Sequence, residues 1–289
     1  MREITRVGVA GCGLMGSGIA EVCARGGLDV VVREIDDAAA AAGRARIEAS
    51  LARAVRAGKL DAEDRDAALA RIRVTTDLAD LADRELIIEA ATENPAVKAV
   101  LFAELDRVAA DPDVILATNT SSIPVIQVAQ ATKRPERVVG LHFFNPVPVQ
   151  RLVEVIPSVL TSPQAVQRVT DLVTKTLGKT VIKAPDRSGF VVNALLVPFL
   201  LAAIRMLDAG YATAEDIDLG MTLGCAHPMG PLRLADLIGL DTLKAVADSM
   251  YEEYKEPLYA APPLLRRMTD AGLLGRKSGR GFYDYQAQT

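Results

Sequence analysis

The stretch that decides the fold is RVGVAGCGLMG, residues 6–16. Its first five residues form the short apolar run that is typical of a buried strand. Gly11, Gly13 and Gly16 then follow in the pattern GxGxxG. Residues 14–25 place apolar side chains at helical spacing, and a glycine pair ends that run. A strand before this pattern and a helix after it are the context that predicts a dinucleotide-binding turn.

Each glycine has a physical task in such a turn. Gly11 makes the tight bend, Gly13 lets the backbone approach a pyrophosphate, and Gly16 lets the helix pack closely on the strand. The helix opens at Leu14 and Met15, where unpaired backbone N–H groups and the positive end of the helix dipole favour an anion. We therefore predict that all five residues contact the cofactor.

A second strand over residues 28–32 ends at Arg33 and Glu34. Glu34 lies 18 residues after Gly16, close to the spacing expected for the acid that binds the adenosine ribose. A carboxylate at this position repels a 2′-phosphate, so the sequence favours NAD. NADP stays the alternative, because Arg33 could accommodate that phosphate.

The remaining pattern predicts an α/β half followed by an all-helical half. Further strands are expected at residues 72–75, 85–89, 113–118, 138–141, 151–156 and 180–182, with helices at 37–57, after Gly58, at 96–109 and at 164–177. Strands that alternate with helices imply a doubly wound, mostly parallel Rossmann-type sheet. Residues 189–271 contain helical patterns and no convincing strand. We therefore expect a Rossmann domain over 1–186 and a helical domain over 187–289.

Composition limits the classes of function. The chain has 289 residues, enough for two domains, and its formal charge of −4 argues against a nucleic-acid binder or a membrane-surface protein. Its three cysteines show no metal-ligand spacing and fit a reducing cytoplasm, and no metal site is expected. The N-terminus lacks a signal-like segment, and the apolar stretch 195–207 is too short to span a bilayer.

The two histidines of the chain differ in their surroundings. His142 follows the strand-like residues 138–141, and the carboxyl edge of such strands is where doubly wound sheets bind ligands. A dehydrogenase that acts on an alcohol needs a base for the hydroxyl proton, and His142 is the candidate. His227 lies in the turn CAHPMGP, where a structural role is favoured.

Seven motifs occur in an order that resembles one family from residue 7 to residue 285. They are the glycine turn, NTSS (119–122), GLHFFNPVP (140–148), LVEVI (152–156), GFVVN (189–193), HPMGP (227–231) and KSGRGFY (277–283). Together they resemble the L-3-hydroxyacyl-CoA dehydrogenase family, and most closely its stand-alone bacterial 3-hydroxybutyryl-CoA members.

The resemblance implies a catalytic pair, His142 and Glu154. The histidine would take the hydroxyl proton, while the glutamate would orient the imidazole and stabilise its charged form. Ser121 and Asn193 match positions that bind the C3 oxygen of the substrate and help to place the thioester. Asn145 matches a supporting polar position near the histidine.

The resemblance also extends the cofactor site. Glu93, Lys98 and Asn119 match positions close to the nicotinamide and its ribose. From the residues alone, Glu93 and Lys98 could equally form a solvated pair at the start of a helix.

A basic row would hold the acyl carrier. Arg46, Ser50, Arg53, Arg56 and Lys59 recur at helical spacing, and in the family this region contacts the CoA nucleotide. The alternative is a solvated basic helix face. The sequence departs from its relatives at Ala57, where they often carry lysine, and at Ala194, where they often carry arginine.

Two rival interpretations follow from the same fold. The 3-hydroxyisobutyrate and 6-phosphogluconate dehydrogenases use a lysine four residues after a helix asparagine, but Val197 occupies that position here. A non-catalytic dinucleotide-binding or structural protein would have no need for a base together with its orienting acid.

The resemblance therefore implies a reversible interconversion of (S)-3-hydroxyacyl-CoA and 3-oxoacyl-CoA with NAD(H). The metabolic setting that it implies is fatty-acid oxidation or butyrate-type metabolism. By the same resemblance, the helical domain would pair with a second copy to form a homodimer.

Overall fold

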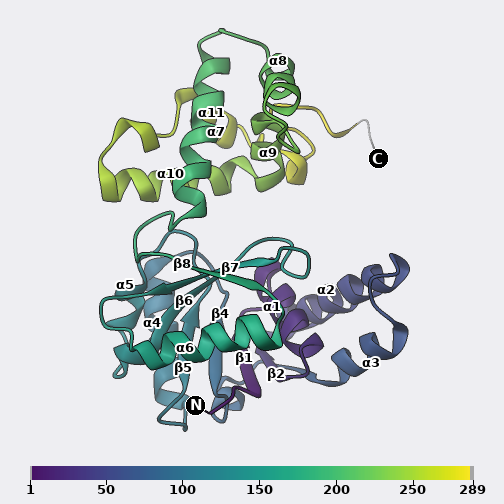
Figure 1. Cartoon of the computed structure of the whole chain (residues 1–289), viewed down its shortest axis with the longest axis vertical. Coiled ribbons are helices and arrows are strands. Elements are labelled where there is room, and N and C mark those ends of the chain that lie inside the picture. The colour runs from purple at the N-terminus through teal and green to yellow at the C-terminus, as the bar shows by residue number, and fades with distance from the viewer. Residues whose placement is uncertain (1, 287–289) are drawn as a thin grey trace. The chain divides into compact units, whose positions relative to one another are not determined.

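The computed structural model describes residues 2–286. The chain forms two compact units that divide between Asp186 and Arg187. Figure 1 shows a sheet with helices in the first unit and helices alone, as regular elements, in the second. This is the expected architecture of a Rossmann-type half followed by an all-helical half.

The first unit is built on one eight-stranded sheet. Its order is β3-β2-β1-β4-β5-β6-β7-β8, and only the β6–β7 pair is antiparallel. The strands are β1 (Arg6–Ala10), β2 (Asp29–Arg33), β3 (Ile72–Thr75), β4 (Leu86–Glu89), β5 (Ile115–Thr118), β6 (Val138–Phe143), β7 (Leu152–Pro157) and β8 (Thr180–Lys183). The first six strands follow the Rossmann order, which reverses direction between β1 and β4.

Helices cover this sheet because its central strands are apolar on both faces. Every residue of β4, β5 and β6 is buried, as expected for strands that lie under helices on both sides. The helices are α1 (Leu14–Arg25), α2 (Asp37–Arg56), α3 (Ala62–Ala70), α4 (Pro95–Val108), α5 (Val125–Ala129) and α6 (Pro163–Asp171). In Figure 1, α2 and α3 form a pair beside α1.

The structure changes three details of the sequence prediction. Strand β6 runs through Phe143 and not only to Leu141, because the antiparallel ladder with β7 continues to that residue. The helix expected over 164–177 leaves α-helical geometry after Asp171 and continues as a π-helical turn to Thr176. The short helix α5 lay in a segment for which no element was predicted.

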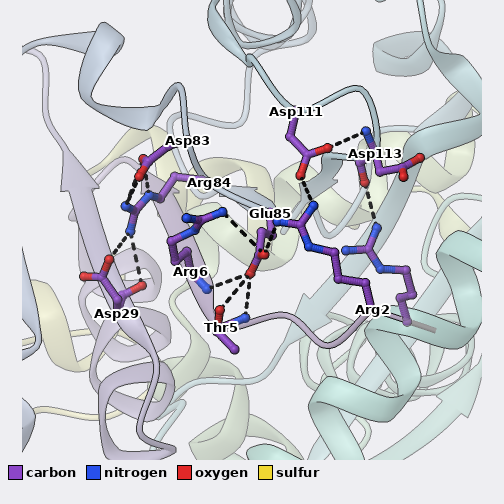
Figure 2. Close-up of polar contacts among 10 residues, drawn as sticks. Arg2, Thr5, Arg6, Asp29, Asp83, Arg84, Glu85, Asp111 and Asp113 are labelled. Atoms are coloured by element: carbon purple, nitrogen blue, oxygen red, sulfur yellow. Dashed lines mark hydrogen bonds and ion pairs between the residues drawn. The ribbon is translucent and has the colours of Figure 1, made fainter.

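A charged network joins the strands at the amino edge of the sheet. Figure 2 shows Glu85 between Arg6 and Arg2. The Glu85 side chain is 4% exposed and accepts hydrogen bonds from the backbone N–H groups of Thr5 and Arg6, at 2.8 and 3.1 Å. Arg2 lies 2.8 Å from the same carboxylate. Glu85 thus fixes the starts of β1 and β4, the two strands at which the sheet order reverses.

The second unit is a cluster of helices with its own apolar core. Its helices are α7 (Val192–Asp208), α8 (Ala214–Leu219), α9 (Pro231–Ile238), α10 (Leu240–Tyr254) and α11 (Pro263–Asp270). Buried side chains such as Leu200, Leu232 and Leu243 come from three of these helices. The core is therefore shared between helices that are distant in sequence.

A buried acid fastens the last described segment to this helical core. Asp236 on α9 is 1% exposed and accepts hydrogen bonds from the backbone of Phe282 and Tyr283, each at 3.0 Å. A side chain at Gly281 would collide with that carboxylate, because an added Cβ would lie 2.0 Å from its oxygen. This contact explains the glycine in the motif KSGRGFY.

Candidate active site

The glycine turn between β1 and α1 has the shape that a dinucleotide requires. Gly11 has a φ of +99°, and a Cβ there would meet the carbonyl of Ala90 at 2.8 Å. A Cβ on Gly16 would lie 1.9 Å from the carbonyl oxygen of Gly11, so helix and strand approach too closely for a side chain. Over Gly13 the space is open, because an added Cβ would meet no atom within 4 Å. The residues present therefore fit a pyrophosphate above Gly13.

The start of α1 supplies the anion-binding end of this turn. Gly13 is the N-cap residue, and no side chain caps the helix. The backbone N–H groups of the first turn are thus left for a ligand, as at other phosphate-binding helix starts. Leu14, the first residue of the helix, has 66% of its surface exposed, whereas Met15 is half-buried.

Glu34 lies next to the glycine turn at the carboxyl end of β2. One of its carboxylate oxygens accepts a hydrogen bond from the backbone N–H of Cys12, and the other accepts from Ile35 at 3.0 Å. From α2, Arg46 donates to the carbonyl of Cys12 at 2.9 Å. These contacts place the predicted ribose-binding acid beside the turn that would hold the pyrophosphate.

His142 and Glu154 face each other across the antiparallel β6–β7 pair. They are direct partners in the strand register, and His142 Nδ1 lies 2.6 Å from a carboxylate oxygen of Glu154. The imidazole side chain is 8% exposed and the carboxylate is fully buried. The ring of Phe144 lies beside the imidazole, with 4.6 Å between ring centroids. The twelve-residue spacing is thus bridged by the antiparallel strand pair, which brings an imidazole and a buried carboxylate together.

Asn119 follows β5 at the same edge of the sheet. Its side-chain oxygen accepts a hydrogen bond from the backbone N–H of Phe143 at 2.9 Å. This bond holds the backbone next to His142, so Asn119 ties the ends of β5 and β6 together. Asn145 lies two residues beyond the end of β6 and is exposed.

Glu93 organises the serine loop that follows β5. One of its carboxylate oxygens accepts hydrogen bonds from Thr120, from the backbone N–H groups of Ser121 and Ser122 at 3.0 and 3.2 Å, and from the Ser122 hydroxyl at 3.0 Å. Partial burial works against ionisation of Glu93, but the Lys98 ammonium and these hydrogen bonds outweigh it and hold its pKa below the ordinary value. Glu93 is therefore an ionised anchor for the loop that carries Ser121.

Lys98 is not part of a solvated pair, so that alternative is wrong. Its side chain is 1% exposed, and its ammonium lies 2.6 Å from Glu89 and 3.4 Å from Glu93. The reason is that α4 packs the lysine onto the end of β4, away from water. Sequence reasoning missed Glu89, although an acid at the carboxyl end of a buried strand, nine residues before a lysine, was a visible signal.

The basic row on α2 runs along the surface from the glycine turn to the α2–α3 connection. Arg53, Arg56 and Lys59 are exposed, and among residues 2–286 none of the three has an ion-pair partner. Ser50 is half-buried in the same helix. Lys59 also lines a cavity of about 660 Å³ together with Arg25 and Arg71.

Asn193 lies in the first turn of α7, in the second unit. His227 also belongs to that unit, where its ring packs against Phe199 with 5.4 Å between centroids. Its backbone N–H donates to the carbonyl of Met221 at 3.1 Å. These contacts tie the turn around His227 to neighbouring helices.

Within residues 2–286, no cluster of three or more histidine, cysteine or acidic side chains could hold a metal ion. Among the helices of that same range, none has the length and apolar character needed to cross a membrane.

A Rossmann sheet that carries an imidazole–carboxylate pair at its ligand-binding edge defines the class of dinucleotide-dependent dehydrogenases. The family model for the NAD binding domain of 3-hydroxyacyl-CoA dehydrogenase matches residues 6–187, and the model for the C-terminal domain of the same enzymes matches residues 189–285. The chain belongs to the 3-hydroxyacyl-CoA dehydrogenase family, and its cofactor is NAD.

Individual relatives match over nearly the whole chain. A 3-hydroxybutyryl-CoA dehydrogenase of Mycobacterium tuberculosis is 61% identical over 98% of this chain and 99% of its own length. The human mitochondrial hydroxyacyl-coenzyme A dehydrogenase is 42% identical over 98% of this chain and 92% of its own length. The crystal structure of (S)-3-hydroxybutyryl-CoA dehydrogenase from Ralstonia eutropha superposes with a TM-score of 0.93 at 46% identity, covering 98% of this chain and all of that one.

Proposed function

We infer that this chain is an NAD-dependent dehydrogenase that interconverts (S)-3-hydroxyacyl-CoA and 3-oxoacyl-CoA, with 3-hydroxybutyryl-CoA as the favoured substrate. The observation that carries this inference is the 2.6 Å contact between His142 and Glu154 at the carboxyl edge of β6. The names of the relatives support the substrate class, because full-length relatives at 61% and 46% identity are called 3-hydroxybutyryl-CoA dehydrogenase and (S)-3-hydroxybutyryl-CoA dehydrogenase.

His142 is the base in this proposal. Because its Nδ1 is engaged by Glu154, proton exchange with the substrate falls to Nε2. During oxidation, Nε2 takes the proton of the C3 hydroxyl, and the buried carboxylate stabilises the imidazolium that forms. A bound NAD would supply the hydride acceptor for C3. In the reverse direction the imidazolium returns its proton to the C3 oxygen.

Ser121 and Asn193 would bind the C3 oxygen and place the thioester. Glu93 supports this role for Ser121, because it fixes the backbone of the serine loop through two N–H groups. Asn145 would supply a further polar group near the histidine. Lys98, Glu93 and Asn119 would surround the nicotinamide and its ribose.

The exposed basic row on α2 would meet the phosphates of the CoA nucleotide. Arg53, Arg56 and Lys59 suit this task because no acidic side chain within residues 2–286 neutralises them. An acidic protein needs such a local patch to attract a polyanionic carrier. Ser50 would add a hydroxyl donor on the same helix.

We propose a homodimer formed through the helical unit. Its surface exposes large apolar side chains on α7, on α9 and in the segment after α8, including Leu195, Leu223 and Leu237 at 75, 78 and 49%. Apolar surface of this extent favours contact with a partner over contact with water. Light scattering should give twice the chain mass, and Leu223→Glu should shift the mass towards that of one chain. A wild-type monomer would contradict this proposal.

A cytoplasmic location and a place in fatty-acid metabolism stay predictions. The alternative of a non-catalytic dinucleotide-binding protein has less support, because a protein that only binds needs no buried acid behind a histidine.

Initial rates with 3-oxoacyl-CoA substrates of four to sixteen carbons, each with NADH and with NADPH, test the proposed function. We expect the highest kcat/KM with acetoacetyl-CoA and NADH. The absence of turnover with every thioester, together with normal NADH binding, would favour the non-catalytic alternative.

A further inference from the structure

Glu89 is a buried acid at the carboxyl end of β4. Its side chain is fully buried. One carboxylate oxygen accepts from the Lys98 ammonium at 2.6 Å and from the backbone N–H of Ala91 at 2.7 Å. The other oxygen accepts from the Thr118 hydroxyl at 2.8 Å. Glu89 therefore connects the ends of β4 and β5 with the first turns of α4.

Lys98 links Glu89 to a second acid, Glu93. Its ammonium is held between the two acids, 2.6 Å from Glu89 and 3.4 Å from Glu93. Burial decreases along the chain of charges, since Lys98 is 1% exposed and Glu93 is 36% exposed. The three groups thus form a path that leads from the core of the sheet to its ligand-binding edge.

Glu93 ends this path at the serine loop. The oxygen that does not face Lys98 accepts hydrogen bonds from both backbone N–H groups of Ser121 and Ser122. It also accepts from the Ser122 hydroxyl at 3.0 Å and lies 3.5 Å from the Ser121 hydroxyl. Glu93 is therefore an anchor of this loop, together with the hydroxyls of Thr118 and Thr120.

We propose that Glu89 is a positioning residue that places Ser121 for the reaction through Lys98 and Glu93. This inference rests on the proposed function, in which Ser121 contacts the C3 oxygen of the substrate. A buried ammonium must keep a compensating charge, because an unpaired ion in the interior is costly. If Glu89 loses its charge, Lys98 must turn to Glu93 alone and draw that carboxylate inward. The serine loop, whose backbone N–H groups donate hydrogen bonds to the Glu93 carboxylate, then moves with it.

A double-mutant cycle on kcat/KM for acetoacetyl-CoA tests this coupling. Glu89→Gln keeps the size of the side chain but removes its charge, and Ser121→Ala removes the hydroxyl that is to be positioned. We expect Glu89→Gln to lower kcat/KM by about 10-fold in the wild-type background and by less than about 2-fold in the Ser121→Ala background, as coupled residues do. Effects that multiply would overturn the inference.

Glu85→Gln is the matched control. Like Glu89, Glu85 is a buried carboxylate with a cationic partner, here Arg2, but it lies next to the opposite end of β4. It should cost stability and leave kcat/KM within about 2-fold in both backgrounds, because distant sites act independently. If Glu85→Gln lowered kcat/KM as much as Glu89→Gln does, a general loss of stability would explain the effect of both variants. That result would contradict the proposal.

A second variant serves if Glu89→Gln does not fold. Glu89→Asp keeps the charge but shortens the side chain, so the carboxylate draws back from the Lys98 ammonium, which lies 2.6 Å away. It should lower kcat/KM by about 3-fold, and Ser121→Ala should again abolish that loss. Multiplicative effects in this cycle would likewise overturn the inference. Wild-type protein that turns over no thioester would instead contradict the proposed function itself, and the inference would fall with it.

Discussion

His142 and Glu154 are opposite each other in the antiparallel pair of β6 and β7, with 2.6 Å between the imidazole and the carboxylate. The rest of the Rossmann sheet is parallel, so this reversal creates the close facing of two side chains. Directly opposite strand partners lie about 5 Å apart at their Cα or Cβ atoms, so their side chains are neighbours on the same face of the sheet. The carboxylate of Glu154 is therefore within reach of the imidazole. The contact between the two proposed catalytic residues is thus a consequence of strand register.

Glu154→Gln should lower kcat while leaving NADH bound normally. The amide keeps the shape of the side chain but cannot stabilise an imidazolium, and its NH₂ group competes for the ring nitrogen. A positioned acid–base pair contributes about 10²–10⁴-fold, so we expect a loss of about 100-fold or more in acetoacetyl-CoA reduction. Fluorescence titration with NADH is the control. A variant with near wild-type kcat would show that the carboxylate does not assist the histidine.

Glu85→Gln should destabilise the first unit by about 2–4 kcal/mol at neutral pH, because it breaks a buried, fully hydrogen-bonded charge. Burial opposes ionisation of Glu85, but hydrogen bonds from Thr5 and Arg6 and the Arg2 charge hold its pKa below the ordinary value.

The pH dependence of this difference follows from the direction of the shift. A lowered pKa gives stability that is present above the unfolded value, about 4.3, and is lost as pH falls through the folded value. The difference in unfolding free energy between wild type and variant should therefore shrink as pH falls below about 4.3. A difference that stays constant from pH 7 to pH 3 would be inconsistent with this role of the carboxylate.

Glu34→Gln should weaken the preference for NADH over NADPH. The glutamine can still accept the hydrogen bond from Cys12, so the turn keeps its shape while the negative charge disappears. Repulsion of the 2′-phosphate then falls, and Arg33 can approach it. We expect the ratio of kcat/KM values for the two cofactors to drop by about 10-fold, equivalent to about 1.4 kcal/mol. An unchanged ratio would remove Glu34 from the ribose site.

Arg53→Glu with Arg56→Glu should raise KM for acetoacetyl-CoA by about 10-fold and make it less sensitive to salt, because screened phosphate contacts are lost. The matched substrate is the acetoacetyl thioester of pantetheine, which lacks the nucleotide. With that substrate the variant and the wild type should have equal KM. A similar KM increase for both thioesters would assign the defect to something other than the CoA phosphates.

The fold could be predicted because its signals are local. The glycine turn, the acid at Glu34 and the alternation of strands and helices lie within short windows, and the structure has the expected Rossmann order. The extension of β6 through Phe143 could not be predicted, because it depends on pairing with β7.

In the candidate site, the contact carried by sequence motifs could be predicted. The contacts of residues that only the fold buries could not. The contact of His142 with Glu154 agrees with the pairing that the family resemblance implied. In the sequence, Lys98 resembled a surface lysine. The spacing of charged residues does not show which of them a helix buries. Glu89 likewise read as the polar end of a strand. Its partners Lys98 and Thr118 are 9 and 29 residues away, so only the fold brings them together.

The role of His142 as the base is tested most directly by single-turnover reduction of acetoacetyl-CoA by His142→Gln loaded with NADH. NADH should bind with wild-type affinity, and the rate of NADH oxidation should fall by at least about 100-fold, because His142 no longer exchanges a proton with the C3 oxygen. A single-turnover rate within a few-fold of wild type would contradict the assignment of His142 as the base of the reaction.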